Sequence, residues 1–174
     1  MTELTLNNIS LRALEPDDTD TLYIWENNPS LWPYGSTRAP MSRHQIWQYV
    51  DSYDGDIFAA HQLRLMIVDK ETSAAVGTVD LYEYDPRDGH AMVGIFIDSR
   101  FRRRGYASSA LKLIEDYARR TVGMHQLAAM VAVDNQASVA LFTKAGFKSR
   151  ACLHSWIKKG RHYCDVLVFQ KLFE

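Results

Sequence analysis

The sequence lacks the features that mark secreted and membrane-spanning proteins. Its longest uninterrupted apolar run, Leu127 to Val133, is far shorter than the roughly 20 residues of a membrane-spanning helix. The N-terminus carries an acid, Glu3, where a secretory signal would carry basic residues, and no apolar stretch follows. We therefore expect a cytoplasmic protein with no membrane partner.

Cysteine is also scarce, and only Cys152 and Cys164 are present. The two thiols could face each other across a hairpin, but two reduced and half-buried thiols are the expected state in a cytoplasmic protein. They lack the paired spacing of a zinc site, and the six histidines are scattered without an HExxH-like pair. The sequence therefore predicts no metal site.

An excess of charge of one sign is missing as well. The chain has 20 Lys and Arg against 21 Asp and Glu, which leaves a net charge of −1. A general nucleic-acid-binding protein usually carries a large basic excess, so we expect no nucleic-acid partner. Apolar residues make up 47% and charged residues 24% of the chain, which is the balance of a globular protein. No linker or repeat divides it, and its length predicts one domain over residues 1–174.

Hydrophobic patterns predict an α/β domain of about seven strands and four helices. Three β-rich runs in the middle of the chain are separated by short turns, which favours an antiparallel meander; they cover residues 64–69, 76–84 and 91–98. The second half then alternates between helix and strand, beginning with a helix from Tyr106. It closes with two strands joined by a tight turn, over residues 149–157 and 162–170.

The most informative segment runs from a strand through a basic loop into a helix. The strand ends at Asp98, the loop holds four arginines between Arg100 and Arg104, and Gly105 opens the helix. Unpaired N–H groups and partial positive charge at a helix N-terminus can hold an anion, and guanidinium groups add charge-assisted hydrogen bonds to phosphates. A solvated basic turn and a short nucleic-acid or nuclear-localisation patch remain alternatives.

Two motifs resemble those of a known enzyme family. Arg102-x-x-Gly105-x-Ala107 is similar to the [Q/R]-x-x-G-x-[G/A] acyl-CoA pyrophosphate loop of the GNAT superfamily of N-acetyltransferases. Residues 134–147 resemble the N-x-x-S-x-x-L-[Y/F]-x-K-x-G-F block of the branch that contains spermidine and ribosomal-protein N-terminal acetyltransferases. The resemblance covers almost the whole chain. It implies a single-domain GNAT-like α/β fold, a mixed, splayed sheet whose fourth and fifth strands part to admit the pantetheine arm of acetyl-CoA.

The resemblance also implies a set of residues that bind acetyl-CoA. Ile95, Phe96 and Ile97 would offer backbone groups to the pantetheine, as an added strand would. The remaining implied cofactor-binding residues lie in the two motifs and are Arg102, Arg103, Arg104, Gly105, Tyr106, Ala107, Ser108, Asn135, Ser138, Phe142 and Lys144. Asn135 could equally be a helix N-cap, and Lys144 could lie on a solvated helix face.

The implied catalytic groups match the chain less well. Where the polyamine branch carries a tyrosine acid and often a glutamate, this sequence has Phe142 and Met92. Glu83 remains as a candidate general base, because strand alternation places it on the same face as Val79 and Leu81, where partial desolvation would favour proton uptake. A strand-end carboxylate that simply faces water is the alternative. Tyr82 and Tyr84, together with Asp80, are expected on the opposite face.

The resemblance implies an acceptor that is a primary amine, either of a small metabolite or of a peptide N-terminus. In the loop where the polyamine enzymes carry acids, this chain has Arg38 with Trp32 and Tyr34, which fits a neutral or carboxylate-bearing amine at least as well as a polyamine. The sequence therefore argues against a specificity for polyamines. The sequence therefore predicts an acetyl-CoA-dependent N-acetyltransferase that could form a homo-oligomer. The alternative, motivated by Phe142 and Met92, is a GNAT-fold protein that binds CoA with weak or no transferase activity.

Overall fold

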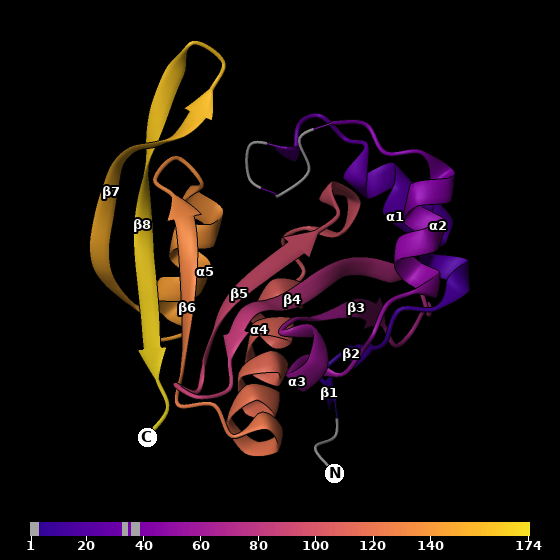
Figure 1. Cartoon of the computed structure of the whole chain (residues 1–174), viewed down its shortest axis with the longest axis horizontal. Helices are drawn as coiled ribbons and strands as arrows, with labels where there is room; N and C mark the ends of the chain where they lie inside the picture. Colours follow the sequence, from indigo (N-terminus) through magenta and orange to yellow (C-terminus); the bar gives the residue numbers. More distant parts are fainter. Residues whose placement is uncertain (1–3, 33–34, 36–38) are drawn as a thin grey trace.

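A computed structural model describes residues 4–32, 35 and 39–174, and the strands of this part form one eight-stranded mixed sheet in the order β1-β2-β3-β4-β5-β6-β8-β7 (Figure 1). The strands are β1 Thr5–Leu6, β2 Ile9–Arg12, β3 Leu63–Asp69, β4 Ala75–Asp85, β5 His90–Ile97, β6 Gln126–Ala132, β7 Lys148–Lys159 and β8 His162–Leu172. The α-helices of the described residues are α1 Thr19–Glu26, α2 Arg43–Asp51, α3 Ile57–Ala60, α4 Tyr106–Tyr117 and α5 Gln136–Lys144.

This architecture confirms the predicted α/β class and the mixed sheet, with one more strand and one more helix than expected. The additions are the two-residue strand β1 and the single-turn helix α3. Both are too short to produce a hydrophobic period that a sequence pattern could reveal. The predicted meander is confirmed, because β3, β4 and β5 pair antiparallel in sequence order.

Alternate residues of the central strands pack against different helices on the two faces of the sheet. The face formed by odd-numbered residues such as Leu65, Val79 and Val93 packs on α4 in the main core. The opposite face, which includes Met66, packs on α1 and α2 in a smaller cluster that also holds Phe96. Each helix therefore covers one defined face, and the side chains of α1 and α2 meet the even-numbered residues of β3, β4 and β5.

Local caps explain where the helices begin. Ser42 and Gln45 form a reciprocal capping box that starts α2, as the sequence predicts. The side chain of Asn135 accepts a hydrogen bond from the backbone N–H of Ser138 at the start of α5. Side chains thus accept hydrogen bonds from two backbone N–H groups at the start of α2 and from one at the start of α5.

The cysteines are both free thiols. Cys152 pairs across the hairpin with Leu167, whereas Cys164 pairs with Ile157, so the two are not cross-strand partners. The predicted half-buried state is correct for Cys164 and wrong for Cys152, which is exposed. Within the residues that the structure describes, the helices are all too short or too polar to cross a bilayer.

Candidate active site

The sheet opens into a wedge between β5 and β6. The two strands run parallel and pair from His90 with Gln126 to Met92 with Ala128. Beyond Met92 they diverge, with β5 still bound to β4 and β6 bound to β8 (Figure 1). Within the part of the chain that the structure describes, no strand pairs with the β6-facing edge of β5 over Ile95, Phe96 and Ile97. These are the residues whose backbone is predicted to pair with a pantetheine arm.

One side of the wedge mouth is the basic loop between β5 and α4. Gly105 is the N-cap of α4, adopts a left-handed φ of 82° and offers no side-chain cap. Among the described residues, no side chain caps the first-turn N–H groups of α4, and these groups sit beside the exposed side chains of Arg102, Arg103 and Arg104. Ala107 and Ser108 leave this first turn uncrowded. The loop combines aligned N–H groups with positive charge, the combination that binds phosphates.

Asp98 holds this loop against the rest of the molecule. Its buried carboxylate accepts a 2.8 Å hydrogen bond from the Trp25 indole of α1 and a 2.6 Å bond from the Arg100 guanidinium. The hydrogen bonds from Arg100 hold the pKa of Asp98 well below its usual range. Arg100 is therefore occupied by an internal ion pair. Arg102 donates from Nε to the carbonyl of Ile97 at 3.2 Å.

Tyr106 takes part in the loop through its backbone alone. Its ring is buried and its hydroxyl donates a hydrogen bond to the buried carboxylate of Asp69, at the end of β3. This hydrogen bond lowers the pKa of Asp69 and raises that of Tyr106. The first turn of α4 is thereby fixed to the β3–β4 turn, so its N–H groups hold one orientation.

The other side of the wedge mouth carries the second motif, and its members lie in different environments. Asn135 and Ser138 are half-buried at the start of α5, and the N-cap alternative for Asn135 is confirmed. Lys144 is exposed on the last turn of that helix. The ring of Phe142 is only 4% exposed and packs in the main core against Phe147. Phe142 thus acts as a core residue, and the structure does not expose its ring to the wedge.

Glu83 is not placed as strand alternation predicts. The register between β4 and β5 shifts between Tyr82 and Asp85, and Glu83 sits in this bulge with a φ of 52°. The extra residue moves Tyr84, instead of Glu83, into the buried position on the α4 face, and leaves the Glu83 side chain exposed. The expected desolvation of Glu83 is therefore wrong, and the alternative of a strand-end carboxylate that faces water is correct. Tyr84 does not line the opposite face.

Asp80 is the carboxylate that the sheet brings to the wedge. Arg64, Asp80 and Gly94 form one cross-strand row on the face of α1 and α2. A Cβ built on Gly94 would lie 4.0 Å from that of Asp80, so the carboxylate stands beside β5 two residues after its last pairing with β6. Arg64 Nε donates to Asp80 Oδ1 at 2.5 Å. Burial raises the pKa of Asp80, although Arg64 opposes the shift.

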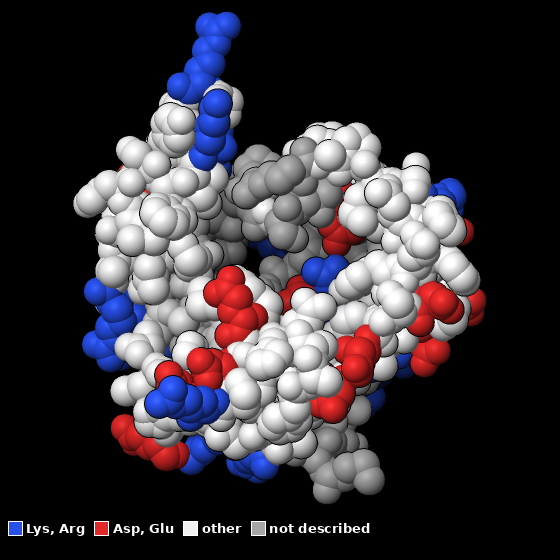
Figure 2. Space-filling model, viewed as in Figure 1, with Lys and Arg blue, Asp and Glu red and all other residues white. Residues whose placement is uncertain are grey.

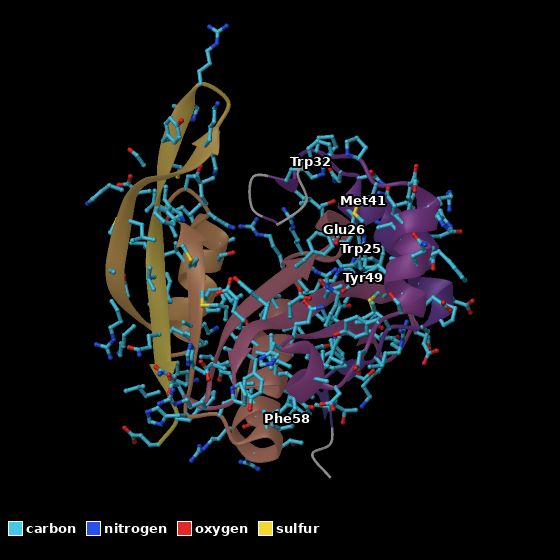
Figure 3. The ribbon with its side chains drawn as sticks, viewed as in Figure 1. Trp25, Glu26, Trp32, Met41, Tyr49 and Phe58 are labelled. Carbon is cyan, nitrogen blue, oxygen red and sulfur yellow. The ribbon has the colours of Figure 1, made fainter. Side chains whose placement is uncertain are left out.

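A pocket of about 220 Å³ lies next to this row, between α1, α2 and β3. It is lined by Leu22, Glu26, Met41, Ile46, Tyr49, Gln62 and Arg64. Figure 3 shows Glu26, Met41 and Tyr49 on the sheet side of α1 and α2, and Figure 2 shows charges of both signs in the hollow between these helices and the β7–β8 hairpin. Burial raises the pKa of Tyr49 to about 12, so its hydroxyl stays a hydrogen-bond donor.

Glu26 brings a second carboxylate to Arg64 at the edge of the pocket. It lies 3.2 Å from Arg64, which is also paired with Asp80, so one cation stands between two carboxylates. Trp32 donates from its indole to the Glu26 carbonyl at 2.8 Å. Sequence reasoning selected Trp32 but missed Glu26, because nothing in a single helix pattern shows that its acid faces a strand arginine. Tyr34 and Arg38 lie outside the described residues.

Comparisons with known proteins agree with this geometry. The model of the acetyltransferase (GNAT) domain matches residues 8–148. The chain belongs to the GNAT acetyltransferase family. As a member of this family, it is an acetyl-CoA-dependent N-acetyltransferase. The predicted resemblance is confirmed, and no finding favours a GNAT-fold protein without transferase activity.

Individual relatives of this GNAT protein cover nearly its whole length. An uncharacterized N-acetyltransferase, p20, of Bacillus licheniformis is 23% identical over 99% of this chain and 97% of its own. Spermidine N(1)-acetyltransferase of Escherichia coli K12 is 24% identical over 94% of this chain and 87% of its own. The fold matches that of spermidine N-acetyltransferase from Vibrio cholerae in complex with CoA and spermine, with a TM-score of 0.84, 23% identity and 95% coverage of both chains. A structure of that Vibrio enzyme is dodecameric.

Proposed function

We propose that this GNAT protein transfers the acetyl group of acetyl-CoA to a primary amine held in the pocket beside Asp80. The observation that carries the proposal is the row Arg64, Asp80 and Gly94, which leads from the pocket to the strand edge at the wedge. Acetyl-CoA supplies an activated thioester. The protein's own residues bind it, orient the amine and accept a proton.

The cofactor-binding residues predicted from the motifs fit this scheme with two adjustments. The open N–H groups of α4 and the exposed Arg102, Arg103 and Arg104 would hold the pyrophosphate. The unpaired edge of β5 would hold the pantetheine, with Asn135 across the wedge. Tyr106 contributes its backbone only, and Phe142 supports the fold from the core.

Asp80 is the proposed general base. The amine nitrogen attacks the thioester carbonyl carbon, its proton passes to Asp80 directly or through a water, and the carbon–sulfur bond breaks to release CoA. Solvent protonates the departing thiolate, because Phe142 and Met92 have no proton to give. Burial raises the pKa of Asp80 toward the working pH, which is the direction that favours general-base catalysis. Arg64 positions the carboxylate through its Nε hydrogen bond.

The acceptor is an amine that carries further positive charge. Glu26 and Asp80 are both ion-paired with Arg64 beside the pocket, and their carboxylates can accept hydrogen bonds from an ammonium group. Tyr49 and Met41 supply apolar walls for an alkyl chain. The relatives from Escherichia coli and Vibrio cholerae, which act on spermidine, support this class. We further propose that residues 1–174 work as one domain and that copies of the chain assemble, as the dodecameric Vibrio enzyme does.

A comparison of two carboxylates tests the proposal. With acetyl-CoA and a diamine substrate, Asp80→Asn should lower kcat/KM by about 10²–10⁴-fold, because general-base help is worth that much. The matched control, Glu83→Gln, should stay within about threefold of the parent, since Glu83 is exposed in the β4 bulge. Asn keeps an oxygen to accept from Arg64, and thermal unfolding measures any loss of folding.

The pH profile separates catalysis from structure in this experiment. The parent kcat/KM should fall at acid pH as Asp80 becomes protonated, and this limb should disappear in Asp80→Asn. An Asp80→Asn protein that folds normally and retains activity within threefold of the parent would exclude Asp80 as the base. If Glu83→Gln lowers kcat/KM more than Asp80→Asn does, Glu83 is the general base, as the sequence predicts.

A further inference from the structure

The β7–β8 hairpin gathers a thiol, an imidazole and a carboxylate away from the proposed active-site pocket. Cys152 and His154 lie on β7, and Asp165 lies on β8. Their ligand atoms all lie within 4.8 Å of one another. The three donors differ in type, so this cluster is distinct from the acidic clusters that are common on protein surfaces. The sequence predicts no metal site here, because the third donor comes from another strand.

A β-bulge in β7 brings the donors together. The register between β7 and β8 shifts between Leu153 and Ile157, and Ser155 within this bulge has a φ of 51°. Its backbone N–H donates to Asp165 Oδ1 at 2.7 Å. The other oxygen, Oδ2, lies 3.0 Å from Nδ1 of His154 and 4.0 Å from Sγ of Cys152. One carboxylate oxygen is thus oriented by the backbone while the other faces the two remaining donors.

We propose that Cys152, His154 and Asp165 bind a zinc ion. Zinc takes thiolate sulfur at about 2.3 Å and imidazole nitrogen or carboxylate oxygen at about 2.0–2.2 Å, in a tetrahedral arrangement. These bond lengths separate neighbouring ligand atoms by roughly 3.3–3.8 Å. The spacings of 3.0 Å and 4.0 Å to the Asp165 oxygen lie within roughly 0.7 Å of this range. The spacing of Cys152 from His154, at most 4.8 Å, would shorten by roughly 1.0–1.5 Å at most. Magnesium and calcium are poorly matched, since they prefer all-oxygen ligands.

A neighbouring backbone group orients one of the three ligands, and the cluster leaves one zinc position open. The Ser155 N–H hydrogen bond fixes the Asp165 carboxylate, as partners of metal ligands commonly do. Three protein ligands leave a fourth zinc position to water. Cys152 is exposed, and the side chain of His154 is 81% exposed. An ion can enter without any rearrangement of the core, and we expect it to be exchangeable instead of permanently buried.

The site connects to the wedge through the main chain. The carbonyl of Asp165 accepts a 3.0 Å hydrogen bond from the N–H of Val133, at the end of β6. Val133 stands two residues before Asn135, which caps α5 at the wedge mouth. A zinc ion would brace β7 against β8 next to this segment. The proposal does not depend on the identity of the acceptor amine or on the role of Asp80.

Calorimetric titration of the full chain with zinc chloride, after removal of metal by a chelator, tests the proposal. We expect one zinc ion per chain. Loss of a hydrogen-bonding partner of a ligand already weakens metal binding by about 10–100-fold, so Cys152→Ser and His154→Ala should weaken it at least as much. Cys164→Ser and His162→Ala are the matched controls, since both residues lie on the same hairpin outside the cluster, and they should bind zinc like the parent.

Cobalt substitution gives a readout that depends on the thiolate. A cobalt ion bound by Cys152 should show a sulfur-to-cobalt charge-transfer absorption, which Cys152→Ser should abolish and Cys164→Ser should retain. Asp165→Asn, which preserves an oxygen for the Ser155 N–H, tests the carboxylate. The proposal fails if the parent takes up no zinc at micromolar concentrations. It also fails if Cys152→Ser and Cys164→Ser bind equally, or if binding shows several weak ions per chain.

Discussion

Asp98 is a single buried carboxylate on which two separate segments depend. It receives hydrogen bonds from Trp25 of α1 and from Arg100 of the basic loop, and these bonds favour its ionised form. Because its pKa is lower in the folded chain than in the unfolded chain, Asp98 stabilises the fold at pH values above its unfolded pKa of about 4. That contribution is lost progressively as the pH falls below about 4.

Asp98→Asn should therefore destabilise the protein at neutral pH and matter less in acid. The lost charge-assisted bonds are worth about 1.5–3 kcal/mol each before compensation by the asparagine, so we expect a lower melting temperature at pH 7. The difference from the parent should shrink between about pH 4 and pH 3. Thermal unfolding of both proteins across this range measures it. A difference that stays constant with pH would show that Asp98 does not act through its charge.

Residue positions on strands were predictable only where the strands are regular. Alternation along β4 correctly sets Asp80 apart from Val79 and Leu81, but it fails at Glu83, because the bulge adds one residue before Asp85. A bulge depends on pairing with β5 and leaves no mark in the sequence of β4 alone. The importance of Asp80 was missed for a similar reason, since its neighbours Arg64 and Gly94 belong to other strands.

At the scale of elements, the junction of β5 with α4 was predictable because all its parts are consecutive. A strand end, a basic loop, a glycine and an amphipathic helix form the motif in order, and the structure supplies the left-handed Gly105 that the motif requires. The wedge itself could not be derived from residue patterns, because it depends on where β5 and β6 stop pairing. It was expected only through the family resemblance, and the observed divergence after Met92 agrees with it.

Binding of CoA should depend on both components of this junction. Arg102→Ala removes a guanidinium that can bind phosphate, and a charge-assisted hydrogen bond worth about 1.5–3 kcal/mol corresponds to about tenfold or more in affinity. Gly105→Val should also weaken binding, since a side chain at a φ of 82° is strained and shifts the N–H groups of α4. No atom lies within 4 Å of a Cβ built on Gly105, so the effect comes from backbone conformation.

Isothermal calorimetry with CoA measures these affinities. Arg161→Ala is the control, because this exposed arginine lies in the β7–β8 turn, away from the basic loop. It should bind CoA like the parent. Unchanged affinity in both Arg102→Ala and Gly105→Val would remove the assignment of this loop to the pyrophosphate, while circular dichroism shows whether each variant is folded.

At the scale of the whole molecule, the wedge divides the sheet into two parts that stay joined by the short β5–β6 pairing and by the main core. In addition to the short β5–β6 pairing, an ion pair joins α4 to β8. The Nζ atom of Lys171 lies 2.6 Å from Oε2 of Glu115. Burial raises the pKa of Glu115, and the lysine opposes this shift. Both parts carry predicted cofactor residues, the basic loop on one and Asn135 on the other. A ligand in the wedge would contact both and restrict their relative movement.

CoA should therefore stabilise the whole chain and not the loop alone. A ligand that binds only the folded state adds about 2.7 kcal/mol to the free energy of unfolding at 100 times its Kd. For a chain of this size, each kcal/mol raises the melting temperature by roughly 2–4 °C, so saturating CoA should raise it by about 5–11 °C. The shift should be much smaller in Gly105→Val at the same concentration. Hydrogen exchange should slow on both β5 and β6 when CoA is added, because the ligand bridges them. Protection confined to the basic loop, with no change on β6, would show that CoA does not occupy the wedge.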